Sequence, residues 1–221
     1  MPAIQWNPNA QPREIVLFGA YPQTATGANS TPIRWRVLQN AGGALFLLSE
    51  YILDCKRYHG AFTKITWRDC DLRKWLNGEF FDTAFNAAER ELIRATHCTD
   101  NGADSPDTED KVFLLSAAEV QDLTAKVDDD PLRVRRRAVG TEYARLKKPD
   151  GCHLYVYDKQ VKADYIVENG AEWGCSWWWL RTRGNAPSRA YFVGARNSIR
   201  SYALVNQARD GVRPALKISL S

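Results

Sequence analysis

The chain has 221 residues and a formal net charge of +4, and hydrophobic residues make up 44% of it, aromatic residues 11% and charged residues 25%. These values are typical of soluble globular proteins and exclude intrinsically disordered and fibrous classes. The basic excess is too small to indicate nucleic-acid binding, which requires a much stronger concentration of Lys and Arg.

The cysteines indicate a reducing environment. They are too few and too widely spaced for a disulfide scaffold, and no pair has the C-x-x-C spacing of a zinc site. The N-terminus has neither the basic nor the apolar region of a secretory signal, and no apolar run reaches the ~20 residues of a membrane helix. We therefore expect cytoplasmic synthesis, no membrane insertion, and association with a virion or a cell surface if the protein acts outside the cell. The free thiols expected are Cys55, Cys70, Cys98, Cys152 and Cys175.

The first fifty residues predict a sheet. Residues 1–14 contain three prolines and predict an extended lead-in, so the domain itself is expected to span residues 15–221. In residues 33–38, apolar side chains alternate with arginines, as in a strand with one solvated face. Residues 44–48 form a continuous apolar run, which indicates burial on both faces. Strands are predicted at residues 15–19, 33–38 and 44–48.

Helices follow the predicted strands. Residues 71–76 predict a short helix that stops near Asn77-Gly78. Asn86 and Glu89 have capping-box spacing, which predicts a helix through Ile93. Ser116 and Glu119 have the same spacing, so a second helix is expected to run to about Leu123, after a strand-like run at residues 112–115.

Residues 128–150 are strongly charged. Three aspartates, Asp128 to Asp130, precede an arginine-rich run at residues 133–137. One interpretation is a surface that binds nucleic acid or another anion. The other, which we favour because the acidic and basic blocks are adjacent, is a solvated segment whose charges neutralise one another.

A search for catalytic and metal-binding patterns gives no assignment. None of the histidines has H-E-x-x-H spacing, and no nucleophile elbow or phosphate-binding glycine loop is present. Cys152 and His153 are neighbours, but adjacent residues on a strand point to opposite faces. Asp128 to Asp130 lack the spacing of a calcium loop. We expect no catalytic residues, no metal and no cofactor.

The composition changes near the C-terminus. Residues 180–216 contain no Lys, Glu, Met or Trp, and Gln207 is the single Gln, although the average frequency of these five types would place about six there. The segment begins after Trp177, Trp178 and Trp179. On a strand, Trp177 and Trp179 would share one face, so we expect them at the rim of a binding surface. The alternative is that all three belong to the core.

Several motifs carry a resemblance to a known family. Trp178-Trp179-Leu180-Arg181, followed by about thirty residues and then by Gly211-Val212-Arg213-Pro214-Ala215-Leu216, is similar to the C-terminal signature of a large bacterial and phage domain family related to the C-type lectin fold. The upstream segments that agree in order are residues 18–23, 33–38, 48–54, 72–77 and 111–116. The resemblance implies a single α+β domain with a C-type lectin fold of the formylglycine-generating-enzyme-like branch.

Several members of this family are variable proteins of diversity-generating retroelements, in which a reverse transcriptase mutates the adenines of a copied template repeat. Adenine mutation of an AAC codon cannot give Lys, Glu, Met, Trp or Gln, which are the types depleted from residues 180–216. Gln207 departs from this pattern and indicates a framework position or a different codon. The resemblance therefore implies a variable region at about residues 180–216.

In that family, variable side chains project from the solvent-exposed face of a rigid core. Exposed positions tolerate substitution at little cost in stability, whereas core positions do not. Framework positions would be Ala190, Val193, Val205 and residues 212–216. The expected ligand-binding residues are Trp177, Trp179, Asn185, Ala186, Ser188, Arg189, Tyr191, Phe192, Arg196, Asn197, Ser198, Arg200, Ser201, Tyr202, Leu204, Arg209 and Asp210.

The expected function is binding of a protein or cell-surface ligand by a monomeric module. Between Arg181 and Arg213 the chain has seven arginines and one Asp, which favours an acidic partner. Two alternatives stay open. One is a lectin-fold binding module without diversification, and the other is an oxidase related to formylglycine-generating enzymes, which would need a reactive cysteine pair near the binding face.

Overall fold

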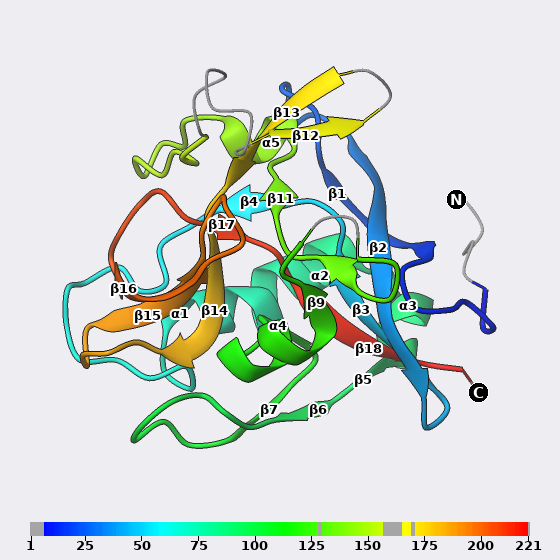
Figure 1. Cartoon of the computed structure of the whole chain (residues 1–221), viewed down its shortest axis with the longest axis horizontal. Coiled ribbons are helices and arrows are strands. Elements are labelled where there is room, and N and C mark those ends of the chain that lie inside the picture. Colours follow the sequence, from blue (N-terminus) through cyan, green and yellow to red (C-terminus); the bar gives the residue numbers. More distant parts are fainter. Residues whose placement is uncertain (1–6, 128–129, 157–164, 169–170, 221) are drawn as a thin grey trace.

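The computed structural model describes residues 7–127, 130–156, 165–168 and 171–220. They form one α+β domain, mostly of strands with a few short helices (Figure 1). Among these residues, no helix is both long and apolar enough to cross a membrane.

The larger sheet contains six strands and holds the centre of the core. Its main path runs β1-β2-β3-β18-β5, and β8 also pairs with β18. Each residue of β3 is buried, as the continuous apolar run predicted. Gly42 and Gly43 both have positive φ angles and make the tight turn between β2 and β3, a conformation that glycine adopts without strain. The strands are β1 (Ile15–Pro22), β2 (Ser30–Ala41), β3 (Ala44–Ser49), β5 (Ile93–Arg94), β8 (Val112–Phe113) and β18 (Ala215–Ser219).

The second sheet has five strands in the order β16-β15-β14-β17-β4, so β16 is an edge strand. Its strands β14, β15 and β16 lie on the left of Figure 1, whereas β1 and β2 lie on the right. β14, β15 and β16 form an antiparallel meander, whereas β14 and β17 pair in parallel. The strands are β4 (Asp54–Cys55), β14 (Trp178–Arg183), β15 (Arg189–Val193), β16 (Ile199–Leu204) and β17 (Gly211–Val212).

The remaining strands of the described residues form three small sheets. β11 (Ala138–Val139), β13 (Ala171–Ser176) and β12 (Tyr165–Glu168) form an antiparallel unit, at the top of Figure 1. The two remaining pairs are β6 (Thr96–Cys98) with β7 (Thr108–Asp110) and β9 (Thr124–Ala125) with β10 (Val134–Arg135).

The first helical segment is longer than predicted. It does not stop at Asn77-Gly78, because α1 (Asp71–Trp75) continues into a π-helical turn, η1 (Leu76–Phe80), and then into α2 (Phe81–Ala84). Asn77 accepts hydrogen bonds from the backbone N–H groups of Lys111 and Val112, and its side-chain amide donates to the Val112 carbonyl at 2.8 Å. These tertiary contacts hold the turn that the sequence alone marks as a helix end.

Both predicted capping boxes are present. Asn86 caps α3 (Ala87–Leu92) and Ser116 caps α4 (Ala117–Leu123), each with a reciprocal Glu three residues later. The remaining helix in the described residues is α5 (Glu142–Arg145). The expected continuation of α3 through Ile93 is wrong by one residue, because Ile93 already pairs with Ile218 of β18.

The arginine-rich half of the charged segment is solvated in part. Arg133 is exposed and Arg135 and Arg137 are half-buried, but Arg136 departs from the favoured interpretation. Arg136 is buried, and its guanidinium donates to the hydroxyl of Thr124 and to the carbonyls of Val120, Thr124 and Asn197. Burial lowers its pKa. Asp128 and Asp129 lie outside the described residues. Arg136 is therefore part of the packed structure, and the mutual neutralisation of the acidic and basic blocks stays a prediction.

Candidate functional site

The predicted binding residues gather on the sheet of β14, β15 and β16 and on its loops. The turn between β14 and β15 is tight: a Cβ added at Gly184 would lie 2.3 Å from the carbonyl oxygen of Ser201. The backbone N–H of Gly184 donates to the carbonyl of Arg189, and the backbone N–H of Asn185 donates to the carbonyl of Ser201. Glycine is thus required where two strands approach the turn closely.

The structure sorts the predicted residues by exposure. The exposed residues are Asn185, Arg196, Arg200, Tyr202, Leu204 and Arg209. The half-buried residues are Trp177, Ala186, Ser188, Arg189, Tyr191, Asn197, Ser198 and Ser201. Trp179, Phe192 and Asp210 are buried. The predicted framework, Ala190, Val193, Val205 and residues 212–216, is buried throughout.

The prediction for Trp179 is wrong. Its indole is fully buried, donates to the Lys56 carbonyl at 2.8 Å and packs edge-on against Tyr58. Trp178 is also fully buried, with its indole N–H directed at the carbonyl of Arg136. β14 is an interior strand with both faces covered, so the rule that alternate residues reach solvent does not apply to it.

Asp210 is also not a display residue. Its side chain is completely buried, and Gln207 donates a hydrogen bond to its Oδ2 atom. Burial raises the pKa of this carboxyl to about 7, against the smaller opposing effects of Gln207 and Arg209. Gln207, the residue that departs from the depletion pattern, therefore has a structural role at the start of β17.

Four aromatic rings form a continuous row across the site, which we call the aromatic row: Tyr155, Trp177, Phe192 and Tyr202. Tyr155 stacks on Trp177 with ring centroids 4.7 Å apart, and Trp177 packs on Phe192 at 5.6 Å. Phe192 meets Tyr202 edge-on at 5.5 Å. The two end rings are exposed by 38% and 50%, whereas Phe192 is 4% exposed. Phe192 thus supports the row from below, and the prediction that it is exposed is wrong.

Tyr155 was not predicted as a site residue. It lies more than twenty positions before Trp177, and only the fold brings the two rings together. Beside it is an open pocket of about 740 Å³. The pocket is lined by Arg145, Gly151, His153, Leu154, Tyr155, Val156, Ala208 and Arg209.

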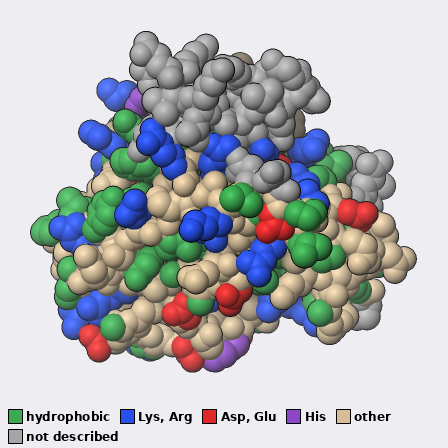
Figure 2. Space-filling model, viewed as in Figure 1, with side chains coloured by type: hydrophobic (Ala, Val, Ile, Leu, Met, Phe, Trp, Pro, Cys, Tyr) green, Lys and Arg blue, Asp and Glu red, His purple; other side chains and the backbone are tan. Residues whose placement is uncertain are grey.

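The basic character of the site is weaker than the sequence predicted. Arg181 and Arg213 are buried, and Arg183 pairs with Asp104 at 3.1 Å. The arginines left on the face are Arg189, Arg196, Arg200 and Arg209. Figure 2 shows basic and hydrophobic side chains next to one another at the left of the view, over β15 and β16. Aromatic and arginine side chains together provide large contact areas for a partner.

Two cysteines meet in a way that the sequence did not reveal. Cys55 and Cys152 lie close together, and their interaction lowers the pKa of Cys152 and raises that of Cys55, while the Cys55 thiol donates to the Ala208 carbonyl at 3.7 Å. Arg57 also donates to the Cys152 sulfur at 3.5 Å. Cys175, the thiol nearest the site in sequence, is fully buried beside Val139. Within the described part of the chain, no group of three metal-ligating side chains comes together.

Comparison with known proteins assigns a family to this domain. A model of a family described as a domain of unknown function, DUF6273, matches residues 42–220. The chain belongs to this family. No curated protein and no solved structure matches it.

Proposed function

We propose that the protein is a ligand-binding variable protein of a diversity-generating retroelement, with a C-type lectin fold. One observation carries the proposal: the segment depleted of Lys, Glu, Met, Trp and Gln contains the whole of β15, β16 and their loops, between the end of β14 and the start of β18. In this segment the predicted framework is buried and most of the predicted variable positions reach solvent.

A binding face of this kind needs a backbone that does not move when side chains change. Arg181 supports β14 through hydrogen bonds to the carbonyls of Leu114 and Thr99 and an ion pair with Glu119. Arg213 fixes the chain between β17 and β18 by donating to the carbonyls of Ser49 and Arg136. Substitutions at exposed positions of β16 would then change binding with little effect on stability.

The ligand is a protein or cell-surface component that contacts the aromatic row and the arginines around it. The four arginines of the face favour an acidic partner. Sequencing the locus across a clonal population tests the proposal. We expect substitutions concentrated within residues 180–216 and a near-copy template repeat beside a reverse-transcriptase gene. A uniform sequence with neither element would support a binding module without diversification.

The oxidase alternative is supported by the contact between Cys55 and Cys152. The oxidase alternative is tested by measuring oxygen consumption in the presence of a peptide that contains cysteine. Cys152→Ser is the test variant, and Cys98→Ser is the control. Turnover that depends on Cys152 and not on Cys98 would favour the oxidase over the binding module.

A further inference from the structure

Cys55 and Cys152 come together at the end of the second sheet. Cys55 lies in β4, the last strand of that sheet, and Cys152 follows a tight turn at residues 148–151. The carbonyl of Ala208 lies between the two segments: it accepts from the Cys55 thiol at 3.7 Å and from the backbone N–H of His153 at 2.8 Å. One backbone oxygen thus holds the two thiol-bearing segments side by side.

Arg57 makes a second bridge between these segments. Its Nη1 atom donates to the carbonyl of Asp150 at 3.0 Å and to the sulfur of Cys152 at 3.5 Å, and it lies 3.5 Å from the Asp150 carboxylate. Asp150 in turn accepts the backbone N–H of Cys152 at 2.9 Å. A guanidinium beside a sulfur favours the thiolate, which is the form of cysteine that reacts with oxidants.

The acidity of Cys152 distinguishes it from the other thiols whose pKa is shifted. The interaction with Cys55, with a smaller contribution from Arg57, lowers the pKa of Cys152 despite its burial. The same interaction, together with burial, raises the pKa of Cys55. Burial raises the pKa of Cys70 and of Cys98 to about 12. Of these four thiols, Cys152 is therefore the one that most readily becomes a thiolate.

The pair adjoins the open pocket of about 740 Å³ beside Tyr155. Gly151 and His153, the chain neighbours of Cys152, both line this pocket, as does Ala208. A small molecule in the pocket therefore contacts the residues on both sides of Cys152. Since Cys55 and Cys152 are 1% and 0% exposed, an oxidant that reaches their sulfurs has to be small.

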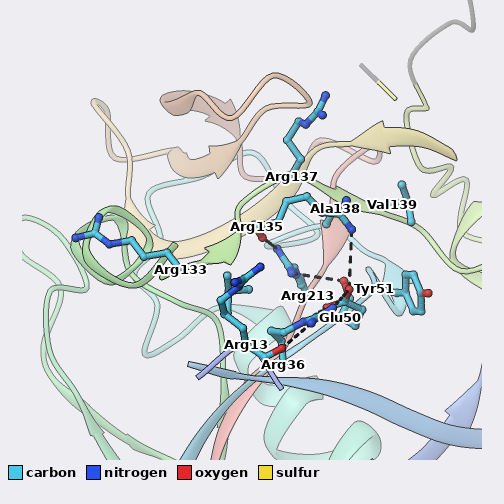
Figure 3. Close-up of a pocket in the computed structure, with 11 residues that line it drawn as sticks. Arg13, Arg36, Glu50, Tyr51, Arg133, Arg135, Arg137, Ala138, Val139 and Arg213 are labelled. Atoms are coloured by element: carbon cyan, nitrogen blue, oxygen red, sulfur yellow. Dashed lines mark hydrogen bonds and ion pairs between the residues drawn. The ribbon is translucent and has the colours of Figure 1, made fainter. Parts of the chain in front are cut away.

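Another cavity, the arginine pocket of about 210 Å³, differs because its inner charges are engaged by the protein itself. Arg36 binds both carboxylate oxygens of Glu50, with its Nε atom 2.8 Å from Oε2 and its Nη2 atom 2.5 Å from Oε1 (Figure 3). Arg213 donates to the carbonyls of Ser49 and Arg136. We therefore assign no ligand to this pocket. Its charged lining residues are Arg13, Arg36, Glu50, Arg133, Arg135, Arg137 and Arg213.

We propose that Cys55 and Cys152 are a redox-active thiol pair that hydrogen peroxide, or another small peroxide, converts into a disulfide. The Cys152 thiolate attacks one oxygen of the peroxide, the O–O bond breaks and hydroxide leaves, which gives a sulfenic acid on Cys152. The sulfur of Cys55 then attacks the sulfenic sulfur and the S–S bond forms, while the hydroxyl group leaves as water with the proton of Cys55. The electron pair that the thiols lose is the pair that reduces the peroxide.

This reaction is separate from the proposed binding function and from the oxidase alternative. It consumes one peroxide for each chain and needs no second substrate, whereas an oxidase turns over with oxygen. The disulfide would fix the turn at residues 148–151 against β4, close in the chain to Tyr155 of the aromatic row. Oxidation would thus join a wall of the pocket covalently to the second sheet.

Peroxide treatment of the folded protein, followed by alkylation under denaturing conditions and peptide mapping, tests the proposal. We expect the alkylated cysteines to fall from five to three, with a linked peptide pair that contains Cys55 and Cys152. Dithiothreitol should restore all five. The oxidised protein should also have a higher Tm, because the link closes a loop of about 100 residues in the unfolded chain.

Single substitutions separate the roles of the two thiols. Cys55→Ala should leave a sulfenic acid on Cys152 that dimedone traps when the protein is unfolded, whereas Cys152→Ala should give neither the trapped product nor the link. Cys98→Ala removes a buried thiol outside the pair and should form the link as the wild type does. Melting curves recorded before oxidation check that each variant is folded.

Arg57→Gln should slow formation of the link several-fold, because it removes the cation beside the Cys152 sulfur. Arg68→Gln, which removes an exposed arginine from the same segment between β4 and α1, is the matched control and should leave the rate unchanged. Five free thiols after peroxide treatment, a link that involves another cysteine, or equal rates in Arg57→Gln and Arg68→Gln would overturn the proposal.

Discussion

Glu119 joins the cap of α4 to the buried guanidinium of Arg181. Its Oε2 atom accepts the N–H of Ser116 at 2.9 Å, and its Oε1 atom accepts from Nη2 of Arg181 at 3.0 Å. Arg181 is 1% exposed and begins the segment in which the proposed variable positions lie. One carboxylate thus completes a helix cap and also balances the buried charge beneath the proposed binding face.

Glu119→Ala should therefore lower the free energy of unfolding by about 3–5 kcal/mol, because it leaves a buried charge unpaired and removes part of a cap. Glu119→Gln should lose less, since an amide oxygen can still accept from Ser116. Chemical denaturation measures both. Glu91→Ala on the exposed side of α3 is the matched control, with an expected change within about 0.5 kcal/mol. Equal effects of the two alanine variants would contradict this role of Glu119.

Alanine substitutions of Phe192 and Tyr202 should distinguish a buried supporting ring from an exposed ring within the aromatic row. Phe192→Ala removes a buried ring and should cost about 3–5 kcal/mol of stability. Tyr202→Ala removes an exposed ring and should cost about 1 kcal/mol or less, the value of one aromatic pair. Thermal and denaturant unfolding of both variants give the comparison. A larger loss for Tyr202→Ala would mean that β16 is a structural strand and not a display surface.

Gly184 and Gly78 should respond to alanine with opposite signs. Gly184→Ala places a methyl group against the backbone of Ser201 and should destabilise the domain by about 1–3 kcal/mol. Gly78 lies in η1 with no other atom within 4 Å of an added Cβ, so Gly78→Ala should stabilise it by about 0.5–1 kcal/mol. The melting temperatures of the two variants, compared with that of the wild type, test this prediction. A Gly184→Ala variant as stable as the wild type would show that the turn can open.

Asp210 should make stability depend on pH. Its folded-state pKa of about 7 lies above the ordinary value of about 3.9, so the folded protein holds this proton more tightly than the unfolded chain. The stabilisation is complete below about pH 4 and is lost as the pH rises to about 7. Asp210→Asn should remove this contribution. The difference in unfolding free energy between wild type and variant, measured from pH 4 to 8, should fall with pH, and a constant difference would exclude the titration.

Local signals predicted local structure well. The apolar run of β3 and both capping boxes are where the sequence places them, because each depends on residues a few positions apart. The π-helical turn at Asn77 was missed because its support comes from Lys111 and Val112.

The exposure of the candidate site residues was also predicted only in part. Composition located the segment of β15 and β16, but alternation misplaced Trp179, since β14 is covered on both faces. Tyr155, the Cys55–Cys152 contact and the arginine pocket could not be predicted, because their members come together only across the tertiary structure.

The position of β18 has a consequence for how the protein folds. This strand pairs with β3, β5 and β8, so Leu216 must find Leu47 and Val112 before the central sheet exists. Contacts so distant in sequence make folding slow, because a long loop must close before they form. The ribosome must therefore synthesise the whole proposed variable region before the core can close. Under the proposed function, each variant would pass through this stage with its side chains unprotected, so yield during synthesis would limit the number of usable variants alongside binding.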